Sequence, residues 1–183
     1  NIKYASASLI ITFFSHCVSA TEVKFGGFVD TYYAYDVNHP ASQDRDYTTQ
    51  AVRNNEFNIN LAYIDAKITG DRLRGRFALQ TGTSVQSNYA GEPTIGSNSG
   101  SSISRFIQEG YAGYQVTPNW WIDAGIMLSH IGMESWISKD NLTYLRSLVA
   151  DYSPYYQAGI RNEIKINDKW SAQILILNGW QNI

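Results

Sequence analysis

A strict alternation of polar and apolar residues dominates the end of the chain. From residue 157 to residue 166, Gln, Gly, Arg, Glu and Lys alternate with Ala, Ile, Asn, Ile and Ile. Three turn-type residues, Asn167–Asp168–Lys169, separate this run from a second run over 170–180. Successive side chains of a β-strand point to opposite faces. The pattern therefore predicts a hairpin whose first strand has one charged face and one mostly aliphatic face.

The same alternation recurs in five earlier runs of the chain. In one of them the apolar set changes face near Tyr63–Ile64, which predicts a β-bulge at that point. The connections between the runs are alternately long and short, the short ones being 70–72, 117–119 and 167–169. Strands are predicted at 23–36, 56–69, 73–86, 105–116, 120–128, 157–166 and 170–180.

This rhythm of short and long connections is typical of bacterial outer-membrane barrels, which have short periplasmic turns and longer external loops. Ten residues tilted by about 45° rise roughly 23 Å, close to the ~25 Å apolar band of such barrels. Lipid offers no hydrogen-bond partner, so the sheet must close. The predicted fold is all-β: an antiparallel up-and-down transmembrane β-barrel. About seven of its strands are present, so we expect the N-terminal part of a larger barrel.

Aromatic residues support this interpretation, because they make up 14% of the chain, with 13 Tyr and 5 Trp. Many stand near predicted strand ends, where barrels carry interfacial aromatic girdles. A secreted soluble β-sandwich or β-barrel remains an alternative, although outward-facing apolar runs would reduce its solubility. The aromatic residues near strand ends are Tyr33, Tyr35, Tyr63, Tyr114, Trp120, Trp170 and Trp180.

Residues 1–20 have the features of a signal peptide. Lys3 supplies the positive charge, an apolar stretch covers 7–14, and Val18–Ser19–Ala20 suits a signal peptidase. The stretch is shorter than the ~20 residues of a transmembrane helix. We therefore expect export, location in the outer membrane, and a mature domain over 21–183. The single cysteine, Cys17, lies in the signal peptide, so no disulfide framework is expected.

Charge and motifs exclude several classes of partner and cofactor. Without Lys3 the chain has 13 basic residues against 16 acidic ones, which is no basic footprint for nucleic acid. The sequence has no Gly-rich phosphate loop and no Cys/His spacing for a metal. No cofactor and no metal are expected. The expected partners are outer-membrane lipid and small hydrophilic solutes, and a homo-oligomer is possible.

Six short segments, in this order and spacing over most of 26–180, carry a resemblance to a known family. They are Gly27–Asp36, Phe57–Leu61, Gln108–Tyr114, Ile131–Ser135, Tyr144–Ser147 and Pro154–Gly159. Together they resemble the OmpL-like β-barrel porins of Gram-negative outer membranes. Gly110 departs from the alanine expected there. The resemblance implies a passive channel for small solutes.

A channel of this kind needs a wet, charged lumen that biases permeation. The alternation places four cations and four anions on the inward face. Mixed rings of these residues would filter solutes by size and charge, or they would form cross-strand ion pairs that stiffen the wall. The predicted pore-lining residues are Arg74, Arg76, Arg161 and Lys165, opposed by Asp30, Glu109, Asp123 and Glu163.

The segment from Ser129 to Tyr156 is long for a connection, and long loops are often functional. Our hypothesis is that it folds inward and narrows the pore, with Glu134 and Arg146 at the constriction. A structured external loop is the alternative.

Two other functions were weighed against the channel. His130 beside Ser129 suggests an outer-membrane lipid hydrolase, but neighbours on a strand point to opposite faces and cannot pair. No catalytic residue is therefore expected. A non-conducting barrel that acts as an adhesin or anchor suits the long loops equally well. Near His39, the acidic loop is interpreted as a solvated loop rather than a cation site.

Overall fold

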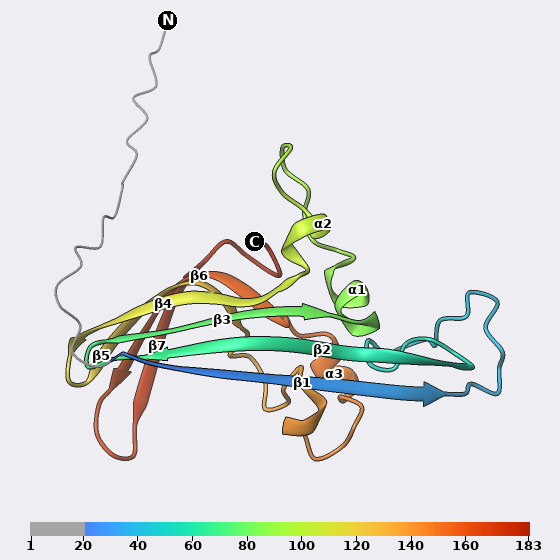
Figure 1. Cartoon of the computed structure of the whole chain (residues 1–183), viewed down its shortest axis with the longest axis horizontal. Helices are drawn as coiled ribbons and strands as arrows, with labels where there is room; N and C mark the ends of the chain where they lie inside the picture. Colours follow the sequence, from blue (N-terminus) through green and yellow to red (C-terminus); the bar gives the residue numbers. More distant parts are fainter. Residues whose placement is uncertain (1–20) are drawn as a thin grey trace, which may run out of the picture.

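The computed structural model describes residues 21–183, so the predicted signal peptide lies outside the described residues. All seven predicted strands are present, and they form one antiparallel sheet in chain order, which confirms the predicted fold class (Figure 1). Short turns join alternate pairs of strands at one end of the sheet. The strands are β1 (Glu22–Ala34), β2 (Glu56–Thr69), β3 (Leu73–Thr81), β4 (Ile107–Thr117), β5 (Trp120–Leu128), β6 (Tyr156–Lys165) and β7 (Ser171–Leu177).

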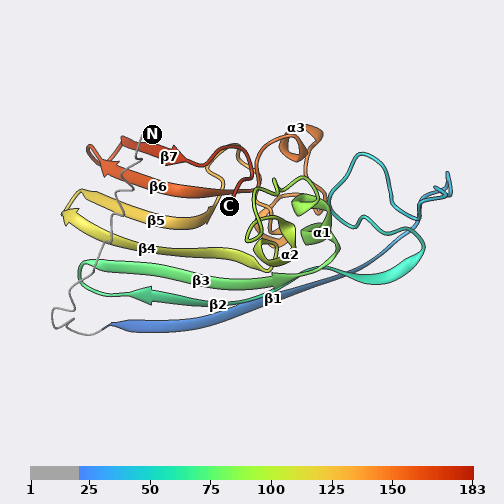
Figure 2. The same cartoon turned by 90° about the horizontal axis from the view of Figure 1, so that it is seen from above.

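The long connections carry short helices at the other end of the sheet (Figure 2). Within the described residues, no helix is long and apolar enough to cross a membrane. The helices are α1 (Thr83–Tyr89), α2 (Ser101–Ser104), the 3₁₀-helix η1 (Ser138–Asp140) and α3 (Leu148–Asp151).

The largest difference in strand length is in β3: the third run was expected to continue to Gln86, but β3 ends at Thr81. The last strand, β7, is also shorter than the predicted run over 170–180. Gly82 has a φ of 138°, and a Cβ at this position would overlap the carbonyl of Asn60. The chain therefore turns sharply and enters α1. Its residue Val85 is almost completely buried, so packing against the core outweighs the local alternation.

The predicted change of face in β2 exists, but it lies three residues earlier than Tyr63. Asp30 is opposite Leu61 while Thr31 is opposite Ile59, so Asn60 is the extra residue of a β-bulge. After the bulge, Leu61 and Tyr63 share the polar face with Asp65. The prediction of a change of face near Tyr63–Ile64 is therefore wrong in position, because the inserted residue, Asn60, already reverses Leu61 and Tyr63.

The sheet is curved into a trough, with β1–β3 in one wall and β5–β7 in the other (Figures 1 and 2). Arg74 of β3 reaches Glu163 of β6, three strands away, with 2.6 Å between Nη2 and Oε2. Neighbouring strands are about 4.8 Å apart, so this contact is possible only on the concave side. We call this concave, charged side the inner face.

The convex side, the outer face, is apolar and largely exposed. The register places its residues directly opposite one another across the strands, as with Ala124 and Ile160 in β5 and β6. Ile122, Ile126, Ile160 and Ile164 share this face, and Arg161 of β6 is on the other. Exposed outer-face side chains include Phe25, Val29, Phe57, Ile64, Phe77, Ile174 and Ile176.

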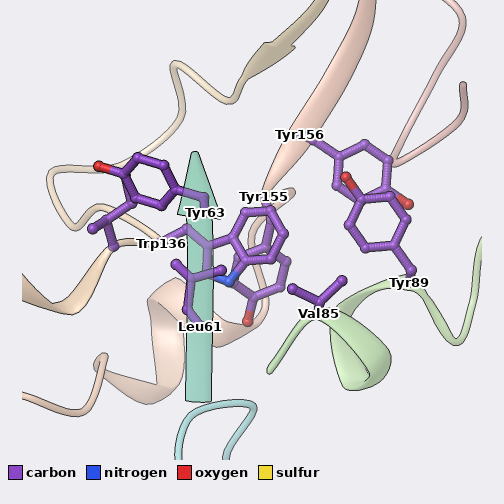
Figure 3. Close-up of a cluster of buried hydrophobic side chains, with 8 residues drawn as sticks. Leu61, Tyr63, Val85, Tyr89, Trp136, Tyr155 and Tyr156 are labelled. Atoms are coloured by element: carbon purple, nitrogen blue, oxygen red, sulfur yellow. The ribbon is translucent and has the colours of Figure 1, made fainter. Parts of the chain in front are cut away.

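The buried core lies at the end of the sheet that carries the long connections (Figure 3). It joins β2 to α1 and to the connection between β5 and β6. The rings of Tyr89 and Tyr156 are stacked, with centroids 4.0 Å apart and planes at 10°. The cluster consists of Leu61, Tyr63, Val85, Tyr89, Trp136, Ile137, Tyr155 and Tyr156.

Candidate functional site

The first half of the candidate site is an ion-pair network around Asp123 on the inner face. Arg74 binds both carboxylate oxygens of Asp123, with N–O distances of 2.7 Å. Arg161 donates to the same carboxylate at 2.9 and 2.7 Å, and Arg74 also binds Glu163. Gly113 lies between Arg74 and Asp123 in the register, and only glycine leaves room for this contact.

A second network surrounds Arg76 one row closer to the long connections. Its guanidinium donates to Asp65 at 2.8 Å and also binds Glu109. Both carboxylates are almost completely buried, so the guanidinium supplies the charge partner that burial requires. Gly26 makes space for Asp65, since a Cβ there would lie 2.6 Å from Asp65 Oδ1.

Aromatic rings hold the three arginines in place. The guanidinium of Arg74 lies over the ring of Trp121, with 4.5 Å from Cζ to the ring centroid. Arg76 lies over Tyr63 and Arg161 over Tyr111, each at 5.6 Å. Such cation–π contacts restrict the side chains as well as stabilising them.

The structure brings six of the eight predicted pore-lining residues into these two networks. Lys165 lies on the inner face by register and binds Asp168 in the adjacent turn at 2.8 Å. Asp30 is also on the inner face, but at the end that carries the long connections. The six residues of the networks are Arg74, Arg76, Glu109, Asp123, Arg161 and Glu163.

Several charged residues of the inner face were not predicted as pore-lining. Asp65 and Lys67 follow the bulge of β2 and share the inner face with Arg76. Lys24 of β1 is directly opposite Lys67. The apolar run from Leu61 to Ile64 breaks the alternation, which indicates a change of face in β2 but does not locate it at Asn60.

The connection from Ser129 to Tyr155, which we call the strap, crosses the inner face to reach β1. Ser138 Oγ donates to Asp30 Oδ2 at 2.8 Å, and the Tyr144 hydroxyl donates to Asp30 Oδ1 at 3.0 Å. Asn60 Nδ2 donates to Asp30 Oδ2 at 2.8 Å. Asp30 is buried, and these three donors satisfy its charge.

A second set of contacts attaches the strap to the connection between β1 and β2. Thr49 Oγ1 donates to the carboxylate of Asp151 at 3.1 Å and lies 2.9 Å from the hydroxyl of Tyr155. Gln50 Nε2 donates to the carbonyl of Trp136 at 3.4 Å. The strap therefore extends from β5 and β6, to which its two ends are joined, to β1 and the β1–β2 connection, where these hydrogen bonds hold it. This is the inward arrangement of our hypothesis.

The two residues expected at the constriction instead stabilise the strap itself. Only 8% of Arg146 is exposed, and its guanidinium lies 4.3 Å over the ring of Tyr155. Glu134 accepts hydrogen bonds from the hydroxyl and the amide of Ser147. These bonds, assisted by the charge of Arg146, lower the pKa of Glu134.

The residues that suggested hydrolysis are not brought together as a catalytic pair. His130 Nδ1 lies 3.0 Å from the side-chain oxygen of Gln157, and Ser129 Oγ accepts a hydrogen bond from the amide of Ile131. Over residues 21–183, no three His, Cys, Asp or Glu side chains are grouped so that they could hold a metal ion.

Comparisons with known proteins identify the family of the chain. No curated protein and no solved structure matches it. A family model described as "Putative beta-barrel porin-2, OmpL-like" matches residues 22–183. The match covers all seven strands and the strap, and it confirms the resemblance noted in the sequence. The chain therefore belongs to the OmpL-like β-barrel porin family.

Proposed function

We propose that the protein forms a passive diffusion channel for small hydrophilic solutes in the bacterial outer membrane. In this proposal the inner face lines a water-filled lumen and the outer face contacts lipid. The observation that carries the proposal is the separation of the two faces: ion-pair networks on the concave side and exposed aliphatic and aromatic residues on the convex side. A soluble barrel would have the opposite arrangement.

The strap gives the proposed channel its narrowest point. It crosses the trough at the end of the sheet with the long connections, and bonds to Asp30 and Thr49 fix it there. A segment held in this way reduces the cross-section that is open to solutes. Its buried contacts with Tyr89 and Leu61 make it part of the core, so it keeps one position.

Single-channel recording tests the proposal. The full-length protein, reconstituted in a planar bilayer, should give defined ohmic current steps. Absence of steps from protein shown to be inserted would favour the second candidate, a non-conducting anchor or adhesin. That candidate draws support from the aromatic cluster, which fills part of the inner face.

Removing the strap tests its role separately. Replacing residues 131–153 by a short Gly/Ser linker should increase the conductance of a single channel. The matched control shortens the exposed segment 93–99 in the connection between α1 and α2, which does not touch Asp30. Equal conductance in the strap variant and the unchanged protein would refute the narrowing role but leave the channel proposal standing.

A further inference from the structure

The inner face carries cations on β1, β2, β3 and β6. In the register, Lys24 of β1 is opposite Lys67 of β2, and Lys67 is opposite Arg76 of β3. In the next row, Arg74 and Arg161 lie on either side of Asp123. We call the set of Lys24, Lys67, Arg74, Arg76, Arg161 and Lys165 the cationic belt.

Part of this belt is unfavourable for stability. Like charges directly opposite each other in a sheet are destabilising, and Lys24 and Lys67 are such a pair. Lys24 has a partner in Glu22, 3.3 Å away. Among residues 21–183, Lys67 forms no ion pair. A row of three cations therefore needs an explanation other than stabilisation of the sheet.

Three acids of the same face are buried beneath the cations, whereas Glu22, the partner of Lys24, is exposed. The side chains of Asp123, Asp65 and Glu109 have exposed fractions of 0%, 5% and 9%. Those of Arg74, Arg161 and Arg76 have 26%, 19% and 12%. The lysines extend further, with 72% for Lys24 and 60% for Lys165. Glu163, at 38%, is the exposed acid within the two networks.

This layering decides which charge a passing solute meets. The carboxylates lie next to the backbone and use their oxygens on the arginines, while the ammonium groups and guanidinium edges face the water. Charges at short range dominate because solution ions screen more distant ones within about 10 Å at 0.1 M salt. Rings of Arg and Lys are the arrangement found in pores that select anions.

We infer that the channel prefers anions, and that its solutes are small molecules that carry a carboxylate or phosphate group. The inference rests on the proposed channel function and names its class of solute. Exposed guanidinium edges bind planar carboxylates and phosphates through paired hydrogen bonds, and the lysines add flexible point charges. The belt thus provides successive weak sites along the inner face, as conduction requires.

The reversal potential in a potassium chloride gradient tests this inference. The full-length protein in a planar bilayer should have a reversal potential of the sign that indicates greater permeability to chloride than to potassium. Lys67→Glu should lower the chloride-to-potassium permeability ratio by at least about threefold, because it reverses an exposed charge on the lumen wall. Lys67 is exposed, so the variant should fold.

Arg45→Glu is the matched control, because it makes the same charge change in the connection between β1 and β2. It should change the permeability ratio much less. Current steps with a preference for potassium, or equal shifts in the two variants, would overturn the anion inference and leave the channel proposal intact. Absence of current from inserted protein would overturn both.

Discussion

The phenol of Tyr144 donates a hydrogen bond of 3.0 Å to the carboxylate of Asp30, and so joins the strap to β1 across 114 residues of chain. This bond and the bond from Ser138 to the same carboxylate fix the strap to the wall of the trough. The attachment of the strap to β1 therefore depends on one buried acid. This dependence leads to the first two predictions.

Tyr144→Phe should weaken the attachment of the strap without removing its packing. Hydrogen bonds to charged groups contribute about 1.5–3 kcal/mol. We therefore expect the free energy that holds the strap against the inner face to decrease by an amount in this range. Hydrogen exchange in residues 129–155 should become faster in the variant. Tyr152→Phe is the control. Tyr152 is exposed, so this substitution should leave the exchange rates unchanged. Equal rates in Tyr144→Phe and the unchanged protein would contradict the tether.

The same bond predicts sensitivity to alkaline pH. Burial, followed by the charge of Asp30 and the hydrogen bond to it, raises the pKa of Tyr144 above its ordinary value of 10.0. The folded strap thus keeps a proton that the unfolded strap loses above pH 10. The contribution of Tyr144 to stability is complete below this pH and decreases as pH rises towards the raised pKa.

Unfolding measured against pH checks this prediction. Between pH 9 and pH 11 the unchanged protein should lose more stability than Tyr144→Phe, which cannot ionise at this position. The difference between the two curves isolates Tyr144, since burial also raises the pKa of Tyr89 and Tyr155 in both proteins. Parallel curves would show that the phenol does not carry the effect.

Asp123 should be the least replaceable acid of the inner face. Its side chain is completely buried and binds two guanidinium groups. Removing one partner of a buried ion pair costs about 3–5 kcal/mol, so Asp123→Ala should destabilise the protein by this amount. Glu163→Gln should cost about 1 kcal/mol or less, because Glu163 is exposed.

The free energy of unfolding of both variants can be measured by urea titration in lipid vesicles, with heat-modifiable mobility on gels as the readout of the folded fraction. If the two variants lost equal stability, the burial of Asp123 would not be the deciding factor. The same two variants separate the role of the ion pairs in stabilising the wall from their role in ion selectivity. Glu163→Gln should change the permeability ratio while it leaves the fold almost unchanged.

The alternation in the sequence was sufficient to predict the faces of β6. Arg161, Glu163 and Lys165 were placed inward from the pattern alone, and the register agrees. The strand β5 was predicted with its observed bounds. Period and turn signals are local, so a chain that obeys them can be interpreted without its tertiary structure.

Two other features could not be predicted, because contacts between distant residues determine them. The bulge at Asn60 depends on its amide reaching Asp30 and Gln50, which are 30 and 10 residues away. The fixed position of the strap depends on Asp30, which is 108 residues from Ser138. Local periodicity contains no information about either contact, so the change of face was expected near Tyr63 and Arg146 was expected in the lumen.

Gly159 should be intolerant of any side chain. It has a φ of 153°, lies opposite Gly125 in the register, and a Cβ there would overlap the carbonyl of Ile176. Gly159→Ala should destabilise the protein by more than about 2 kcal/mol. The control, Gly91→Ala, should change the free energy of unfolding by no more than about 0.5 kcal/mol, because a Cβ at this position would meet no atom within 4 Å. Equal urea midpoints for the two variants would refute the steric argument.

Two neighbouring residues of β7 test which face contacts lipid. Ile174 is exposed on the outer face, while Gln173 is on the inner face opposite Glu163. An arginine facing the middle of a bilayer costs about 2–4 kcal/mol, so Ile174→Arg should lose this much stability in lipid vesicles. Gln173→Arg adds the same charge beside a carboxylate and a wet lumen, and should change stability by about 0.5 kcal/mol or less.

The comparison of Ile174→Arg with Gln173→Arg is informative because both variants introduce the same charged side chain at neighbouring positions on opposite faces. If Ile174→Arg loses more stability than Gln173→Arg in vesicles, and this difference decreases in solution without lipid, then hydrocarbon covers the convex side. A larger loss for Gln173→Arg would place the dry interior on the concave side. That result would contradict the lumen on which the strap and the cationic belt depend.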